Sequence, residues 1–307
     1  MSASGGRTAD SGEFEVLIAR VIAEPAALSA NCERAVHAIE AQGARVHGAD
    51  PLPGLDEVLQ FMVDDADAAA LRGVLDRHFA PADLLVVEHL PQLPRVFVSD
   101  MDSTMIAQEC IDELADFAGI KAEIAAITER AMHGELDFAE ALTGRVRLLG
   151  GLPEDTIQQC LDQRVTDMPG ARTLVATLRA HGCKTVLVTG GFHQFADPVG
   201  ARLGFDRVVA NRLEVLHGNL TGGLVGDLVD SSIKQRVLRK AAEEAGGASL
   251  ATGDGANDVA MLQAATYGLA YHAKPKARAA AHGWIEAGDL TSVLLLLGIA
   301  RADWAPA

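Results

Sequence analysis

The chain has 307 residues and a formal net charge of −16, because 42 Asp and Glu outnumber 26 Lys and Arg. Its apolar fraction of 49% and charged fraction of 22% are typical of a globular protein, and its length suffices for about two domains. The acidic balance argues against a general nucleic-acid binder or a binder of anionic membranes, since both partners carry negative charge.

The cysteine spacing, the N-terminal residues and the length of the apolar stretches predict a soluble cytoplasmic protein. The four cysteines are far apart and form no Cys-x-x-Cys pair, which argues against a zinc ribbon and predicts free thiols. Residues 1–12 are small and polar, without the apolar segment of a signal peptide, and we expect a flexible tail there. The longest apolar stretch, around Val293–Ala300, is too short to span a bilayer.

A small α+β unit is predicted for residues 13–90. Apolar patterning predicts strands at Phe14–Ile22, Ala44–His47, Val58–Val63 and Leu84–Glu88, and helices at Ala26–Gln42 and Asp67–Phe79. This βαββαβ order is the ferredoxin-like pattern. Residues 91–94 (PQLP) then predict a stiff linker.

Residues 95–300 alternate apolar strands with amphipathic helices, as in an α/β fold with a doubly wound parallel sheet. Three predicted strands, Val96–Ser99, Thr185–Val188 and Ser249–Thr252, each run into a polar turn. If these strands are parallel neighbours, the three turns meet at the carboxyl edge of one sheet, where ligands bind in such folds. The mainly helical residues 106–167 are too long for a plain crossover and predict an inserted cap, and residues 301–307 predict a second tail.

Carboxylates dominate two of these turns. Asp100 and Asp102 follow the first strand, and Asp254 and Asp258 follow the third. Clustered carboxylates repel one another unless a bound cation or a shared proton neutralises part of their charge. A divalent metal ion that prefers oxygen ligands can do this. Mg²⁺ suits such a site when phosphate oxygens and water complete its shell.

The same turns offer the parts of a phosphoryl-transfer site. An aspartate can act as nucleophile, and a second one can protonate the leaving oxygen and later deprotonate water. Thr189 and Gly190 offer a hydroxyl and approachable backbone N–H groups to phosphate oxygens. Lys234, in a predicted helix at Ile233–Ala245, is a candidate for the cation that clamps the transferring group.

The motifs Asp-Met-Asp-Ser-Thr, Val-Thr-Gly-Gly-Phe and Gly-Asp-Gly-Ala-Asn-Asp, with Lys234 between the last two, resemble the haloacid-dehalogenase (HAD) superfamily of aspartate-nucleophile phosphatases. More narrowly, the chain resembles the phosphoserine phosphatases. The resemblance covers roughly residues 95–298 and implies a HAD-like fold with a helical cap. The preceding unit resembles the ACT-type domain that many members carry.

The resemblance implies a role for each matching residue in the core. Asp100 is the nucleophile that forms an aspartyl-phosphate, and Asp102 is the general acid and then the base. Mg²⁺ is held by the Asp100 carboxylate, the Asp102 main-chain carbonyl and Asp254, with support from Asp258. The residues that contact the phosphoryl group are Thr189, Gly190, Lys234 and Asn257.

In the cap, the resemblance implies three substrate-binding residues. Glu109 pairs with the substrate amino group, Arg145 pairs with its carboxylate, and Phe138 closes over the site. These charges complement phosphoserine, and an arginine can bind a carboxylate with two parallel hydrogen bonds. One departure is Thr189, which stands where the family usually has serine; threonine keeps the hydroxyl and adds a methyl group.

Each of these features also has a simpler interpretation. A lone Asp-x-Asp is most often a surface turn, and Lys234, Glu109, Arg145 and Phe138 taken singly would be ordinary surface charges or packing residues. The third turn lacks the last glycine of a dinucleotide fingerprint. The run Lys274–Lys276 (KPK) is interpreted as a solvated turn.

The resemblance therefore predicts a Mg²⁺-dependent enzyme that hydrolyses phosphoserine to serine and phosphate, the last step of serine synthesis. One alternative is a related phosphatase or phosphotransferase that acts on another small phosphomonoester. A second is an amino-acid-sensing protein whose phosphatase half is silent. For the ACT-like unit, serine binding and homodimer formation are the two hypotheses.

Overall fold

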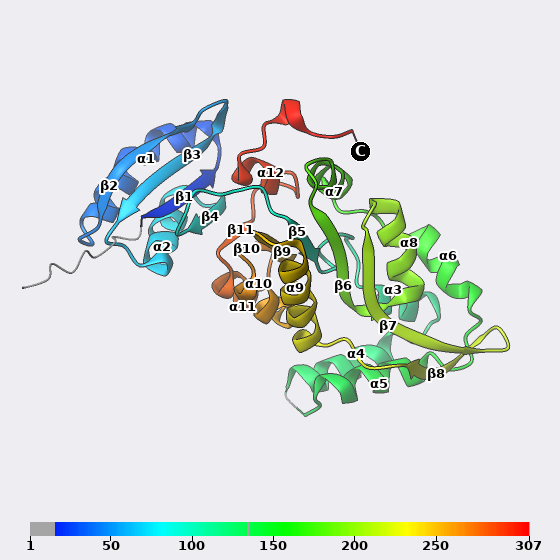
Figure 1. The fold of residues 1–307 in the computed structure, drawn as a ribbon. Helices are drawn as coiled ribbons and strands as arrows, with labels where there is room; N and C mark the ends of the chain where they lie inside the picture. Colours follow the sequence, from blue (N-terminus) through cyan, green and yellow to red (C-terminus); the bar gives the residue numbers. More distant parts are fainter. Residues whose placement is uncertain (1–15, 134, 307) are drawn as a thin grey trace, which may run out of the picture.

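The computed structural model describes residues 16–133 and 135–306, and one sheet runs through both halves of the chain (Figure 1). The strand order is β2-β3-β1-β4-β11-β10-β9-β5-β6-β7-β8. The tail predicted for residues 1–12 and the start of the strand predicted from Phe14 lie outside the described residues. The strands that begin the chain therefore share a sheet with the strands that end it.

The N-terminal unit contributes four antiparallel strands and two helices. Their bounds are β1 (Leu17–Ile22), α1 (Pro25–Glu40), β2 (Arg45–Leu52), β3 (Leu55–Asp64), α2 (Ala68–Phe79) and β4 (Asp83–Val87). The order β2-β3-β1-β4 is that of a ferredoxin-like sheet. Asp67 begins α2 by accepting a hydrogen bond from the N–H of Ala70. The second strand is longer than the predicted Ala44–His47, because pairing with β3 stabilises residues whose own pattern is weak.

The core of the second unit is a parallel sheet with β5 at its centre. Its strands are β5 (Val96–Ser99), β6 (Lys184–Phe192), β7 (Arg207–Leu216), β9 (Ser249–Gly253), β10 (Tyr267–Tyr271) and β11 (Gly283–Ile285). Parallel partners flank β5 on both sides, β6 on one and β9 on the other. The chain order reverses at β5, and such a switch point creates a crevice at the carboxyl ends of the strands.

Helices cover both faces of this sheet. The helices after the cap are α7 (Ala171–Ala180), α8 (His193–Leu203), α9 (Ser231–Ala245), α10 (Val259–Ala264), α11 (Pro275–Ala280) and α12 (Ser292–Leu297). One buried cluster includes side chains of α7, α8, α12 and the cap. The other includes side chains of α9 and α10 together with α1 and α2 of the N-terminal unit. The hydrophobic core therefore continues from one unit into the other.

The two units join where β4 pairs antiparallel with β11. Gly283 makes this approach possible, because a Cβ at that position would overlap the backbone carbonyl of Leu84. Arg278 of α11 adds a two-pronged ion pair with Asp76 of α2. The predicted linker at residues 91–94 thus connects two units that also share strand pairing and polar contacts.

The inserted segment is helical, as the chain between the first two turns predicts. Its helices are α3 (Cys110–Phe117), α4 (Lys121–Met132), α5 (Phe138–Leu148) and α6 (Asp155–Arg164). A hairpin of β7 and β8 (Asn219–Val225), which sequence patterning did not predict, packs against α5. In Figure 1 the hairpin extends from the core sheet to the cap. The cap is therefore supported by core residues far away in sequence.

Trp304 and Ala305 contact the rest of the second unit, within the segment 301–307 that the sequence predicts to be a tail; residue 307 lies outside the described residues. The Trp304 indole donates to the carbonyl of Ile299, and the N–H of Ala305 donates to Thr177 of α7.

Across the described residues, no helix combines the length and apolar character needed to cross a membrane.

Candidate active site

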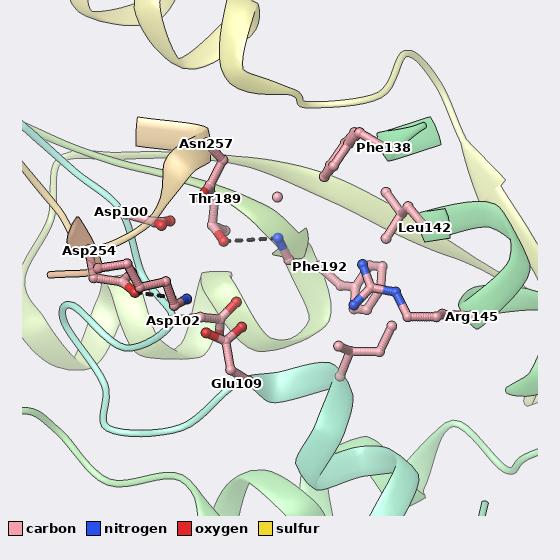
Figure 2. A pocket seen from close by; sticks show the side chains of 14 residues that line it. Asp100, Asp102, Glu109, Phe138, Leu142, Arg145, Thr189, Phe192, Asp254 and Asn257 are labelled. Atoms are coloured by element: carbon pink, nitrogen blue, oxygen red, sulfur yellow. Dashed lines mark hydrogen bonds and ion pairs between the residues drawn. The ribbon is translucent and has the colours of Figure 1, made fainter. Parts of the chain in front are cut away.

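The turns that follow β5 and β9 meet the end of β6 at one edge of the sheet, below the helical cap. The strand predicted at Thr185–Val188 continues to Phe192 in the structure, so residues 189–191, predicted as the second turn, form the irregular end of β6. In-register parallel pairing brings the three strand ends side by side. A cavity of about 170 Å³ opens there (Figure 2). Its lining residues are Asp100, Asp102, Glu109, Ile111, Phe138, Leu142, Arg145, Thr189, Gly190, Gly191, Phe192, Asp254, Asn257 and Lys274. Nine of the eleven predicted site residues lie on this wall, and Lys234 and Asp258 lie behind it.

Asp100 lies at the base of the cavity, on the turn after the central strand. Its carboxylate accepts the N–H of Met101 and pairs with the buried ammonium of Lys234, 2.8 Å away. Burial and the neighbouring Asp258 carboxylate raise the pKa of Asp100 well above its usual value, and Lys234 opposes them. The charge of this carboxylate therefore depends on the cations around it.

Asp258 stabilises the third turn, which follows β9, through contacts of its carboxylate with Lys234 and with the backbone of the turn. One of its oxygens is 2.8 Å from the Lys234 ammonium, and the other accepts the backbone N–H groups of Asp254 and Gly255. Burial lowers the pKa of Lys234, but the carboxylates of Asp100 and Asp258 outweigh burial and raise it. A charged Lys234 thus ties the first turn to the third.

Three buried carboxylates fit a divalent cation. Asp100, Asp254 and Asp258 each offer one oxygen, and these oxygens lie within 4.8 Å of one another. Burial raises the pKa of Asp254 as well. The surroundings of the cluster therefore solvate its negative charges poorly, and a bound cation would stabilise them. Hard oxygen ligands in this number suit Mg²⁺ or a similar ion. The set includes the carboxylate of Asp258, whereas the family resemblance implies the main-chain carbonyl of Asp102.

Asp102 lies across the cavity and faces Glu109 (Figure 2). The backbone N–H of Cys110 donates to the Asp102 carboxylate at 3.1 Å. Burial and the negative charge of Glu109 raise the pKa of Asp102 to about 7, against the opposing effect of the Cys110 hydrogen bonds. A carboxyl group with this pKa can give and take a proton near neutral pH.

Residues 189–191, the second turn of the sequence analysis, present a hydroxyl and half-buried backbone at the end of β6. The Thr189 hydroxyl lines the cavity and accepts the N–H of Gly191 (Figure 2), so its own proton can be donated to a ligand there. A Cβ at Gly191 would approach the Asp102 carboxylate to 3.0 Å, so glycine leaves room for that group. Sequence reasoning missed Asn211 of β7, whose side chain donates to the carbonyl of Gly190 and accepts the N–H of Val229. The Asn211 side chain thus links the second turn to the backbone at Val229.

The cap supplies the outer wall of the cavity. A capping box of Asp137 and Glu140 begins α5, so that Phe138 stands in its first turn. The Phe138 ring lies over Gly190 of the core. Arg145 follows two turns later on α5 and points into the cavity (Figure 2). Burial lowers the pKa of Arg145, while Asp112 and Glu109 oppose the effect. The cap wall thus carries an apolar lid, a cation and the Glu109 carboxylate.

One predicted solvated residue belongs to the site. Lys274 lines the cavity, and its ammonium is 3.3 Å from a carboxylate oxygen of Asp254. Lys274 comes just before α11, and its position beside the third turn depends on the return of the chain through β10. Nothing in its sequence context marks it. The apolar lining residues Ile111, Leu142 and Phe192 were likewise missed, since they resemble core residues.

Comparisons with known proteins agree with this geometry. Residues 97–263 match the family model of haloacid dehalogenase-like hydrolases. The chain is 45% identical over 254 residues to a phosphoserine phosphatase of Streptomyces coelicolor, which covers 80% of this chain and 61% of that relative. It is also 45% identical over 202 residues to a phosphoserine phosphatase of Idiomarina loihiensis, covering 65% of this chain and 91% of the relative.

A solved structure extends the likeness across both units. The crystal structure of a probable phosphoserine phosphatase from Vibrio cholerae, in unliganded form, superposes with a TM-score of 0.70 at 32% identity. The match covers 94% of this chain and 88% of the other. The chain spans less than two thirds of the Streptomyces relative, so that protein has further sequence outside the match.

Proposed function

Because the chain belongs to the haloacid dehalogenase-like hydrolase family, we propose that it hydrolyses O-phospho-L-serine to serine and phosphate. The observation that carries this proposal is the pairing of a nucleophile with an amino-acid receptor in one cavity. Asp100 and Asp102 lie at the base, and Glu109 and Arg145 lie on the cap wall. The relatives named above as phosphoserine phosphatases support the same substrate.

The proposed reaction begins with Asp100. A carboxylate oxygen of Asp100 attacks phosphorus, and the bond between phosphorus and the serine oxygen breaks. The Lys234 ammonium favours the charged form of the buried Asp100 carboxylate, against burial and Asp258, which raise its pKa. The Thr189 hydroxyl and the backbone of the second turn would donate to the phosphoryl oxygens and stabilise the charge that develops there.

Asp102 is the proposed proton carrier. With a pKa of about 7 it is substantially protonated at neutral pH and can donate its proton to the departing serine oxygen. The resulting carboxylate then takes a proton from the water that hydrolyses the aspartyl-phosphate, which releases phosphate and restores Asp100. The two aspartates thus divide the work because only Asp100 is paired with a buried ammonium.

The proposed cofactor is Mg²⁺, held by Asp100 and Asp254 with Asp258 beside them. When bound, a divalent ion supplies positive charge that draws phosphate oxygens to an otherwise negative site. The family resemblance adds the main-chain carbonyl of Asp102 to this set.

Substrate selection is proposed to occur at the cap. Glu109 would receive the ammonium of phosphoserine, and Arg145 would receive its carboxylate. Phe138 and Leu142 would exclude water around the short serine carbon chain. A phosphomonoester without these two charges would leave Arg145 and Glu109 without partners, which lowers its transition-state binding.

A phosphate-release panel tests the proposal. Purified full-length protein is assayed with phosphoserine, phosphothreonine, a sugar phosphate, glycerol phosphate and an aryl phosphate, with and without Mg²⁺. We expect phosphoserine to have the highest kcat/KM, activity to require the metal, and Asp100→Asn to abolish turnover while keeping the thermal unfolding transition. Serine binding without turnover would favour a silent sensor, and preference for another phosphomonoester would replace the substrate.

For the N-terminal unit, which resembles an ACT-type domain, we propose regulation by serine or homodimer formation. Support comes from its ferredoxin-like strand order and from β2, which lies at the edge of the sheet formed by the described residues. Light scattering gives the mass in solution, and phosphatase assays with added serine give inhibition. A monomer whose inhibition by serine is explained entirely by competition at the active site would contradict both roles.

A further inference from the structure

Lys274 occupies a position that the proposed reaction does not use. We propose that its ammonium is a displaceable counter-cation for Asp254, which competes with the divalent metal and sets the affinity of the site for it. This inference rests on the proposed function, because it takes the carboxylate cluster to be a metal site.

The surroundings of Lys274 are a set of carboxylates from both parts of the site. Its Nζ atom is 3.3 Å from Asp254 Oδ2, and it lines the cavity together with Glu109 of the cap. Burial lowers the pKa of Lys274, but Asp254, Glu109 and Asp258 together raise it. The ammonium therefore lies in a strongly negative region, to which a divalent cation would also be attracted.

The ion pair between Lys274 and Asp254 can separate without a change in the backbone. The backbone N–H of Lys274 donates to the backbone carbonyl of Asp254 at 2.9 Å, which fixes the two residues side by side. The Lys274 side chain is 67% exposed, whereas that of Asp254 is 9% exposed. Water is thus available to the ammonium at once if it moves away, and the turn beneath keeps its backbone hydrogen bond.

Stability of the fold does not explain a lysine here. Lys274 is the N-cap residue of α11, and a cation at a helix N-terminus is unfavourable because the helix dipole is positive there. An ion pair with so exposed a partner contributes little to the stability of the fold. The helix is held at its other end by the ion pair of Arg278 with Asp76. The charge of Lys274 is therefore best explained by Asp254.

Lys234 provides the contrast within the same cluster. Its ammonium contacts Asp100 and Asp258 at 2.8 Å and is 1% exposed, so it cannot move into water without breaking the core. One lysine is thus a permanent partner and the other an exchangeable one. A site with an exchangeable cation avoids bare carboxylates before the metal arrives and pays for this with weaker metal binding.

The test is calorimetric titration of Mg²⁺ into metal-free protein without substrate, using wild type, Lys274→Gln, Lys274→Arg and Lys276→Gln. Lys276 is an exposed residue of the same short helix with no ion pair among the described residues, so its variant matches the change in net charge. We expect Lys274→Gln to bind Mg²⁺ roughly three- to tenfold more tightly at low salt, with the gain shrinking as salt rises. Lys274→Arg and Lys276→Gln should stay near the wild-type affinity.

A second readout is the thermal midpoint. Because a ligand that binds the folded state more tightly stabilises it more, the same concentration of added Mg²⁺ should raise the thermal midpoint of Lys274→Gln further than that of wild type or Lys276→Gln. Equal or weaker Mg²⁺ binding by Lys274→Gln would overturn the inference while leaving the proposed function intact. Unchanged Mg²⁺ affinity with a raised KM for phosphoserine would overturn it in favour of direct substrate binding. Wild-type protein that binds no divalent ion would remove the metal site itself, and this inference with it.

Discussion

The ammonium of Lys234 lies 2.8 Å from a carboxylate oxygen of Asp100, and neither side chain is more than 6% exposed. A second carboxylate, that of Asp258, is equally close to the same ammonium. Because a buried carboxylate is costly unless it is paired, this lysine determines whether the first turn can hold a negative charge at all.

Replacing Lys234 with Met should therefore damage both stability and activity. Two buried carboxylates lose their partner, and breaking such a pair costs about 3–5 kcal/mol. Urea denaturation of the metal-free protein measures this cost, and phosphate release should fall to background. The control is Lys240→Met, which removes an exposed lysine on the same helix and should change stability by less than about 0.5 kcal/mol. Similar stabilities for the two variants would contradict the role given to Lys234.

The raised pKa of Asp102 predicts a pH-dependent stability. The folded protein holds this proton up to about pH 7, whereas the unfolded chain releases it near pH 4, so ionisation of Asp102 costs stability as the pH rises through that window. Relative to Asp102→Asn, metal-free wild type should lose roughly 1–3 kcal/mol between pH 4.5 and pH 8, allowing for solvent screening at this partly exposed side chain. Parallel denaturation curves of the two proteins at both pH values measure it. A constant difference between them would mean that Asp102 titrates normally.

Arg145 should select the substrate carboxylate. Arg145→Met is expected to raise KM for phosphoserine about 10- to 100-fold, equivalent to about 1.4–2.8 kcal/mol, because the substrate carboxylate loses a partly buried guanidinium. KM for an aryl phosphate should change little. Arg147→Met, on the exposed side of the same helix, serves as the control. Equal effects of Arg145→Met on both substrates would exclude recognition of the amino-acid part.

Metal removal should abolish phosphate binding. The cavity base is negative without a divalent ion, so chelator-treated protein should show no titration heat with inorganic phosphate, and added Mg²⁺ should restore it. Mg²⁺ at 100 times its Kd should also stabilise the fold by about 2.7 kcal/mol. Asp254→Asn should lose most of both effects. Phosphate affinity that survives chelation would contradict the carboxylate cluster as a metal site.

Gly283→Ala tests the joint between the two units. The added Cβ would overlap the Leu84 carbonyl, so β4 and β11 must separate locally at a cost of about 1–3 kcal/mol. Hydrogen exchange should show faster exchange at β4 as well as at β11. Gly73→Ala in α2 has only ordinary contact at its Cβ and should instead stabilise the protein by about 0.5–1 kcal/mol. Unchanged protection of β4 in Gly283→Ala would mean that the joint is not needed to hold the units together.

Local patterning was enough to identify the elements that carry the chemistry. The strand predicted at Val96–Ser99 has those bounds in the structure, since a short apolar run before a polar turn is a strong local signal. Asp100 and Asp254 could be assigned to one site because parallel strands end at the same edge of a sheet. Arguments of this kind need only the residues near each motif.

Other features were decided by contacts between distant parts of the chain. Lys234 is buried between two carboxylates, and Lys274 lies at the cavity. Nothing in the local sequence of either lysine indicates these positions. Asn211 fastens the second turn from a strand that patterning did not predict. Such roles depend on which partners the fold brings within hydrogen-bonding distance, and no single stretch of residues contains that information.

The charge of the chain illustrates the same division. The sequence by itself determined an acidic protein with four aspartates in strand-end turns, which is enough to predict a cation site. Only the tertiary structure decided how each carboxylate is compensated: Asp100 and Asp258 pair with a buried lysine, Asp254 pairs with an exposed one, and burial beside Glu109 raises the pKa of Asp102 to about 7. The physical reason is that the energy of a charge depends on burial and on neighbours within a few ångströms, and both are properties of the folded chain.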